Sequence, residues 1–372
     1  MTRFLMMVLM LSASLSGCLA DELVGMDDDP CIGTPVTRAD DGTLRILTYD
    51  ITAFSDAMLT EFTEQSGYEV ELMLADDAGG ILERMLQTQT APQADVAVGL
   101  DNTYLQTAID FCLLTPHDVS TDAVDDEVMA MYDGPLAVPF DQGHVCLNYD
   151  ETAVDGENLT APTSLWNLTE VEWKGKTVFP SPLTSSPGRA FMVATIDYFE
   201  NDGDANTTAF DWWKAMAENE AVFTTGWTEA YETYYTGGYG PWTDGHLGGA
   251  ALTVSYCHSP GVEAFYGENW TISTSLVLPR ATFHQVEYGG LVNGGANSEA
   301  ANAFLTYLLS EEVNRNMPEN NLMKSVLHNA TWPETAGYGF HTDEPTQNAN
   351  VSNVRIGEEM AEWLVAWSVA TQ

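Results

Sequence analysis

Aromatic side chains gather in one short stretch of this chain, in segments that we expect to be mostly loops. Seven Trp and Tyr residues fall within 30 positions: Trp227, Tyr231, Tyr234, Tyr235, Tyr239, Trp242 and Tyr256. Aromatic faces attract cations and flat rings, and a desolvated cation–π contact contributes about 2 kcal/mol. Trp227 follows Gly226 at an expected strand end, which favours a binding role, whereas Tyr234 and Tyr235 at the end of an expected helix favour core packing. The stretch therefore indicates a site for a small flat or cationic molecule.

Carboxylates and one tyrosine follow the ends of strands in the first third of the chain. Periodicity predicts strands at 44–49, 69–74 and 95–99 and helices at 54–65 and 81–87. This alternation predicts a parallel, doubly wound sheet, which binds ligands at the carboxyl ends of its strands. Tyr49, Asp76, Asp77 and Asp101 fall at or just past those ends. We expect them near a site.

A second set of elements predicts a second lobe, and so an α/β clamshell with its ligand cleft between two lobes. Strands are expected at 136–141, 145–149, 177–179, 221–224 and 251–256, with helices at 189–199, 210–217, 298–309 and 358–370. We expect lobe 1 to comprise 43–138 and 280–335, lobe 2 to comprise 139–279, and a helical segment to follow at 336–372.

Catalytic and metal-binding motifs do not emerge from the sequence. It has no Gly-rich phosphate loop, no His-Glu-x-x-His and no Gly-x-Ser-x-Gly. His258 beside Ser259 suggests a hydrolase site, but a role in supporting a loop is favoured. Asp76 and Asp77 lack the ligand spacing of a calcium loop. We therefore expect a protein that is not an enzyme and that has no metal or cofactor.

The net charge of the chain restricts the classes of partner that it can bind. The chain has 55 Asp and Glu residues against 12 Lys and Arg residues, a formal net charge of -43. Nucleic acids and anionic membranes are excluded as partners, because no basic patch exists to displace phosphate counterions. A diffuse acidic surface suits a saline exterior, where salt screens self-repulsion.

The N-terminus predicts export and lipid anchoring. Residues 1–17 have a basic start and a short apolar run, as in a signal peptide. Leu15-Ser16-Gly17-Cys18 resembles the lipobox of prokaryotic lipoproteins, which implies cleavage before Cys18 and lipid on its thiol. Residues 18–42 then form an acidic tether. We expect the protein on the outer face of the cytoplasmic membrane, attached through lipid alone.

Four further cysteines allow two disulfides in three possible pairings. They are Cys31, Cys112, Cys146 and Cys257. We favour Cys31–Cys112, which would join the tether to lobe 1, and Cys146–Cys257, which would join two strands of lobe 2.

Several motifs in order resemble the substrate-binding proteins of thiamine ABC transporters, within a wider class that includes iron(III) and polyamine binders. The matching blocks are Ala94-Asp95-Val96-Ala97-Val98-Gly99-Leu100-Asp101-Asn102, Thr184-Ser185-Ser186-Pro187-Gly188, Gly226-Trp227-Thr228-Glu229-Ala230-Tyr231 and Ser255-Tyr256 with Ser259-Pro260. Of these, Gly99-Leu100-Asp101-Asn102 and Gly226-Trp227-Thr228-Glu229-Ala230-Tyr231 are specific to the family. The resemblance spans 44–323 and implies a type II periplasmic-binding-protein fold. It implies a monomer that delivers thiamine or a thiamine phosphate to a permease and an ATPase.

The resemblance also implies ligand residues, and the side-chain chemistry agrees. Tyr49, Asp77, Ser185, Trp227 and Tyr256 would line the cleft. Tyr49 and Trp227 offer faces to the thiazolium and aminopyrimidine rings, and Asp77 would accept from the exocyclic amine. Ser185 and Ser186 precede an expected helix, whose N-terminus suits a phosphate ester or the hydroxyethyl oxygen.

The chain departs from the family pattern in ways that leave the exact ligand open. Leu322 and Val262 stand where aromatic residues are expected, and residues 237–249 form an extra loop. We expect Trp242 in this loop either to close over the ligand or to pack on the surface. A pyrimidine precursor or another small cation, an iron(III) or polyamine ligand, and a secreted hydrolase of a small cation remain as alternatives.

Overall fold

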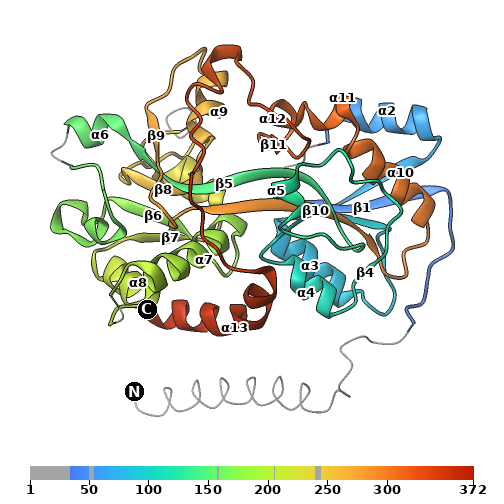
Figure 1. The fold of residues 1–372 in the computed structure, drawn as a ribbon, viewed down its shortest axis with the longest axis horizontal. Coiled ribbons are helices and arrows are strands. Elements are labelled where there is room, and N and C mark those ends of the chain that lie inside the picture. Colours follow the sequence, from blue (N-terminus) through green and yellow to red (C-terminus); the bar gives the residue numbers. More distant parts are fainter. Residues whose placement is uncertain (1–33, 50–53, 157–158, 205, 239–243) are drawn as a thin grey trace, which may run out of the picture.

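Two α/β lobes make up the computed structural model, which describes residues 34–49, 54–156, 159–204, 206–238 and 244–372 (Figure 1). Each lobe has its own hydrophobic core. The first core includes Ile46, Val98 and Phe304, and the second includes Phe179 and Trp212. The predicted two-lobed α/β architecture is confirmed.

Lobe 1 begins with the predicted strand–helix alternation. Its elements are β1 (Thr43–Tyr49), α2 (Asp56–Ser66), β2 (Glu69–Ala75), α3 (Ala78–Gln87), β3 (Val96–Asp101) and α4 (Leu105–Asp110). The three strands are parallel, in the order β2-β1-β3. Ser55 caps α2 by accepting from the backbone N–H of Met58 at 3.3 Å, and Gly67 ends that helix with a φ of 80°. These local caps thus determine where α2 begins after β1 and where it ends before β2.

Two long strands join the lobes. They are β5 (Val138–Asp150) and β10 (Phe283–Val292), which pair antiparallel. β10 also pairs with β3 of lobe 1, and β5 pairs with β8 (Leu252–Tyr256) of lobe 2, so one sheet continues through the molecule. Figure 1 shows β5 and β10 running across the junction. Side chains in the middle of these strands therefore lie where the lobes meet.

Lobe 2 surrounds the other end of this sheet. Its further elements are α6 (Glu151–Gly156), β6 (Thr177–Pro180), α7 (Ser186–Asn201), α8 (Ala209–Glu218), β7 (Val222–Thr224), a π-helix η3 (Glu229–Tyr234), α9 (Ser259–Tyr266) and β9 (Ser273–Leu276). Its core is rich in aromatic residues: Phe179 packs edge-on against Trp212 and Trp213, with centroids 5.9 Å and 5.2 Å away. Helix α7 starts at Ser186, three residues before the predicted start at 189, so Ser186 lies in its first turn.

The remaining elements are divided between the two lobes, and the last of them ends the chain. They are β4 (Leu114–Thr115), α5 (Asp126–Met129), the 3-10 helices η1 (Leu165–Thr169), η2 (Val171–Trp173) and η5 (Thr335–Gly337), α10 (Ser298–Leu308), α11 (Glu311–Asn314), α12 (Met317–Asn320), β11 (Lys324–Ser325) and α13 (Asn353–Ala370). Of these, η1 and η2 belong to lobe 2, where Leu165 and Trp173 join its core.

The C-terminal helix α13 contacts both lobes. Trp363 and Trp367 are buried in the core of lobe 2. At the start of α13, Asn353 Nδ2 donates to the backbone oxygen of Met131 in lobe 1 at 3.0 Å. Gly357 lies so close to α4 that a Cβ there would be 2.7 Å from Cγ of Gln106. Helix α13 therefore lies across the junction of the lobes.

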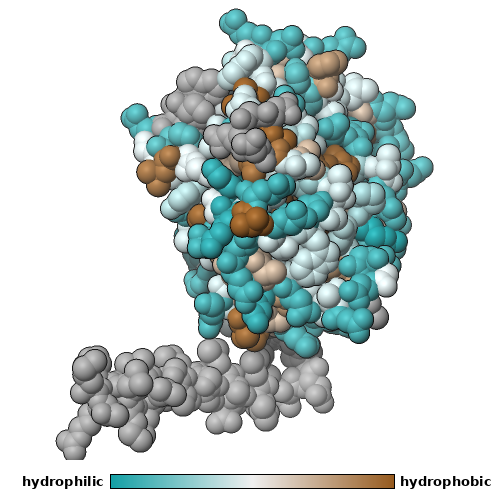
Figure 2. Space-filling model, turned by 90° about the vertical axis from the view of Figure 1, so that its left-hand side faces the viewer, coloured by the Kyte–Doolittle hydropathy of each residue, from teal (hydrophilic) through white to brown (hydrophobic). Residues whose placement is uncertain are grey.

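The surface of lobe 2 facing the viewer in Figure 2 is mostly hydrophilic, with apolar side chains in small separate groups. In the part of the chain that the structure describes, no helix is both long and apolar enough to cross a bilayer.

Candidate ligand-binding site

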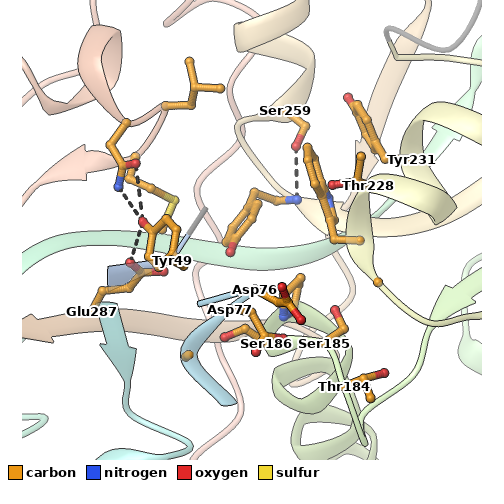
Figure 3. A pocket seen from close by; sticks show the side chains of 18 of the residues that line it. Tyr49, Asp76, Asp77, Thr184, Ser185, Ser186, Thr228, Tyr231, Ser259 and Glu287 are labelled. Atoms are coloured by element: carbon orange, nitrogen blue, oxygen red, sulfur yellow. Dashed lines mark hydrogen bonds between the residues drawn. The ribbon is translucent and has the colours of Figure 1, made fainter. Parts of the chain in front are cut away.

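A cavity of about 500 Å³ lies between the lobes, and both lobes supply its lining (Figure 3). The lining residues are Tyr49, Asp76, Asp77, Ala78, Thr184, Ser185, Ser186, Pro187, Thr225, Gly226, Trp227, Thr228, Tyr231, Tyr256, His258, Ser259, Val262, Glu287, Asn321, Leu322 and Met323. A volume of this size suits a small organic ligand.

Aromatic rings from lobe 2 form one wall of this cavity. Trp227 follows β7, and its ring stacks on Tyr231 of η3 with centroids 4.9 Å apart and an interplanar angle of 18°. The indole Nε1 donates to Oγ of Ser255 at 2.9 Å, which fixes the orientation of the ring. Tyr256, at the end of β8, stacks on His258 with centroids 5.1 Å apart. This wall offers pre-positioned faces to a flat ligand.

Two helix N-termini, one from each lobe, face each other below this wall. Asp77 caps α3 by accepting from the backbone N–H of Gly80 at 3.0 Å, and Ser185 caps α7 by accepting from that of Gly188 at 3.3 Å. Figure 3 shows Asp77, Ser185 and Ser186 on the same side of the cavity. Burial raises the pKa of the Asp77 carboxyl.

The opposite wall is a polar network around Tyr49 at the end of β1. Its hydroxyl donates to Oε2 of Glu287 at 2.9 Å, and Asn321 Nδ2 donates to the tyrosine oxygen at 3.0 Å. The same amide donates to Asp141 on β5. Burial raises the pKa of Tyr49 well above its ordinary value, so the phenol remains a donor.

Direct contacts between the lobes lie next to the cavity. Ser186 of α7 donates to Oδ2 of Asp101 at the end of β3. The guanidinium of Arg189, one turn further along α7, lies 3.9 Å from the ring centroid of Tyr104 in lobe 1. These contacts join the two lobes beside the cavity.

The structure brings most of the residues predicted for the site together. Tyr49, Asp77, Ser185, Ser186, Trp227 and Tyr256 all line the cavity. Asp101 is fully buried and is not among the described lining residues; it contacts Ser186 and Thr103 instead. Trp242 lies outside the described residues, so its role as a lid stays a prediction.

Sequence reasoning missed Glu287 and Asn321. Glu287 lies inside β10, a strand that was not predicted from the sequence. A partial signal was present: a single acidic residue stands among the apolar and aromatic residues of the run Phe283-His284-Gln285-Val286-Glu287-Tyr288-Gly289-Gly290-Leu291-Val292. A charge in such a run is unfavourable unless it has a function or a partner.

Neither a hydrolase nor an iron site is supported by these contacts. Ser259 Oγ is hydrogen-bonded to Ser255 Oγ at 2.7 Å and accepts from the backbone N–H of Tyr256. The ring of His258 packs between Tyr256 and Trp332, and burial lowers its pKa to about 3. Tyr235 is buried and donates to Ser273 at 3.0 Å, away from the lining. Among the described residues, no group of three or more His, Cys, Asp or Glu could hold a metal ion.

One of the two favoured disulfide pairings is present. Cys146 on β5 is bonded to Cys257 directly after β8, with Cα atoms 5.1 Å apart. Cys112 is also disulfide-bonded. Cys31 lies outside the described residues, as does Cys18, so the Cys31–Cys112 pairing and the lipid anchor stay predictions.

Known proteins resemble this chain in sequence and in fold. Residues 57–322 match the family model described as bacterial extracellular solute-binding protein. The thiamine-binding periplasmic protein of Escherichia coli is 24% identical over 309 residues, 83% of this chain and 86% of that protein. The protein of the same name from Haemophilus influenzae is 23% identical over 293 residues, 78% of this chain and 80% of that protein.

Solved structures agree on the fold. A periplasmic thiamin binding protein superposes with a TM-score of 0.73 at 24% identity, over 91% of this chain and 99% of that one. Iron-bound HitA from Pseudomonas aeruginosa superposes with a TM-score of 0.64 at 15% identity, over 89% of this chain and 99% of that one. The family match covers well over half of the chain, and the cavity lies where two lobes meet. The chain belongs to the family of bacterial extracellular solute-binding proteins.

Proposed function

We propose that this protein binds thiamine outside the cytoplasmic membrane and delivers it to the permease and ATPase of an ABC importer. The observation that carries the proposal is the charge of the cavity. Asp76, Asp77 and Glu287 line the cavity, and none of the lining residues that the structure describes is Lys or Arg. An acidic, partly desolvated cavity selects a cation.

The aromatic wall favours a flat cation over a point charge. Trp227 and Tyr231 are stacked and fixed by hydrogen bonds before any ligand arrives. Thiamine has a cationic thiazolium and a flat aminopyrimidine, which match this wall. The hydroxyethyl group, or a phosphate ester on it, is assigned to Ser185 and Ser186 at the N-terminus of α7. The names of the relatives support the same ligand.

The test has two parts. First, mass spectrometry of ligand released by denaturing the purified protein should detect thiamine or its phosphate. Second, calorimetry should show tight binding of thiamine and much weaker binding of its neutral pyrimidine half alone, because the half lacks the cationic ring. Tighter binding of spermidine or of iron(III) than of thiamine would assign the protein to one of the alternative ligands. Conversion of thiamine to products during incubation would support the hydrolase alternative.

We further propose that lipid on Cys18 holds the protein to the outer face of the membrane. The motif Leu15-Ser16-Gly17-Cys18 supports this assignment. Two acyl chains on one diacylglyceryl group suffice for lasting attachment. The C18S variant should move from the membrane fraction to the medium. Retention of C18S in the membrane fraction would contradict the anchor.

A further inference from the structure

Two carboxyl groups lie side by side beneath the cavity. Glu287 on β10 is the direct cross-strand partner of Asp141 on β5. In such an antiparallel pair the Cβ atoms are about 5 Å apart and the side chains leave the same face of the sheet. Both residues are buried, with exposed fractions of 6% and 0%. Glu287 reaches the cavity lining, while Asp141 lies behind it.

The groups around this pair are neutral or acidic. Tyr49 of β1 and Gln285 of β10 donate to Glu287, at 2.9 Å and 3.3 Å. Asn321 donates to Oδ2 of Asp141 from the segment after α12. Oδ1 of Asp141 has no hydrogen-bond partner within the described residues.

Two cations lie on the packed elements, and each acts on other acidic groups. Arg189 of α7 lies against Tyr104 and acts on Asp101 and Asp77. Lys324 of β11, the strand that pairs with β5 beside Asp141, is ion-paired with Glu344. Asp101 of β3 and Tyr256 of β8 complete the titratable surroundings, and the negative charge of Asp101 acts on Glu287. Across the cavity stand Asp76, Asp77 and the neutral His258. No described residue of the lining is Lys or Arg.

Two adjacent carboxylates in a dry site do not both ionise at neutral pH. Burial raises the pKa of Asp141 to about 8. Burial, together with the negative charge of Asp141, raises the pKa of Glu287 well above its ordinary value. The empty pair therefore retains a proton, and a bound cation would supply the opposite charge that it lacks.

We propose that Glu287 is the counter-ion for the cationic ring of the ligand, and that the Glu287–Asp141 pair releases a proton to solvent when this cation binds. The inference rests on the proposed function. One carboxyl O–H bond breaks, its proton goes to solvent, and no bond forms to the ligand. The site exchanges one proton for one organic cation, so its net charge does not change.

This exchange makes affinity depend on pH with a definite sign. Protons and the cation compete for the pair, so affinity rises as pH rises toward the raised pKa and levels off above it. If one proton leaves per ligand, the dissociation constant falls about tenfold per pH unit. Folding stability follows the opposite direction: raised carboxyl pKa values stabilise the empty protein at low pH, and this contribution is lost as pH rises through them.

The test is calorimetric titration of the purified full chain with thiamine at pH 7, in buffers of different ionisation enthalpy. The dependence of the binding enthalpy on the buffer gives the number of protons exchanged. We expect the wild-type protein to release about one proton for each thiamine bound. The E287Q variant should release less than about a quarter of a proton for each thiamine bound. E287Q should also bind about tenfold more weakly at pH 8, because the counter-ion is gone.

A matched control is D150N. Asp150 is also a buried carboxyl on β5, but its partners Thr152 and Thr236 lie outside the cavity lining. The D150N variant should release the same number of protons per bound thiamine as the wild type. The wild-type measurement decides the question even if a variant fails to fold. Thiamine binding without proton release, or unchanged release by E287Q, would overturn this inference alone. Absence of thiamine binding would overturn the proposed function and this inference with it.

Discussion

Truncating Trp227 to alanine should weaken thiamine binding more than any other single change in the aromatic wall. The ring is held by a stack on Tyr231 with centroids 4.9 Å apart and by a 2.9 Å hydrogen bond to Ser255, so it is in place before the ligand arrives. Removing it eliminates one aromatic contact of about 0.5–1.5 kcal/mol and one cation–π contact of about 1–2 kcal/mol. Together these ranges give about 1.5–3.5 kcal/mol. A loss near the middle of that range, about 2–3 kcal/mol, corresponds to a dissociation constant about 30- to 150-fold larger.

Isothermal titration calorimetry at fixed salt and pH measures this change. W227F keeps a ring but loses the donor to Ser255, so it should bind with an affinity between those of W227A and the wild type. W270A is the matched control, because Trp270 is 50% exposed and is not among the lining residues. The reasoning would be refuted if folded W227A bound thiamine within about threefold of the wild type.

Three further predictions concern closure, the disulfide and salt. Removing the guanidinium 3.9 Å from the Tyr104 ring in R189A loosens the contact between lobes and should speed thiamine dissociation about three- to tenfold in stopped-flow measurements; an unchanged rate would show that this contact does not hold the lobes. Replacing Cys146 and Cys257 together by serine should cost about 2–5 kcal/mol in denaturant unfolding, because their bond closes a long loop across a separation of 111 residues; equal midpoints would contradict this. With a net charge of -43, the melting temperature should rise between low and molar KCl, and a constant or falling value would argue against charge repulsion as a limit on stability.

Local patterns predicted most of the secondary structure, because the signals are short-range. The strand at 44–49 and the helix after it follow from periodicity, a Ser cap and a stop glycine. The start of α7 was placed three residues late, because Ser186 and Pro187 look like loop residues although proline is favoured in the first turn of a helix. The strand β10 was missed because polar residues such as Gln285 and Glu287 interrupt its apolar run.

The residues of the site likewise differ in whether their positions could be predicted from the sequence. Residues at strand ends and helix caps, such as Tyr49, Asp77 and Ser185, could be placed from their local position. Glu287 and Asn321 could not, since they reach the cavity through pairing with segments more than 100 residues away. Asp101 shows the reverse case: it follows a strand end as expected, but a contact from the other lobe covers it.

The position of α13 across both lobes affects how binding energy is used. A helix anchored by Trp363 and Trp367 in one lobe and by Asn353 against the other limits the range of open arrangements that the empty protein samples. Less conformational entropy is then lost on closure, so a larger share of the contact energy in the cavity appears as affinity. The same restraint opposes separation of the lobes. A permease that collects the ligand must therefore contribute, through its own contacts with the two lobes, the free energy that moves one of them away from α13.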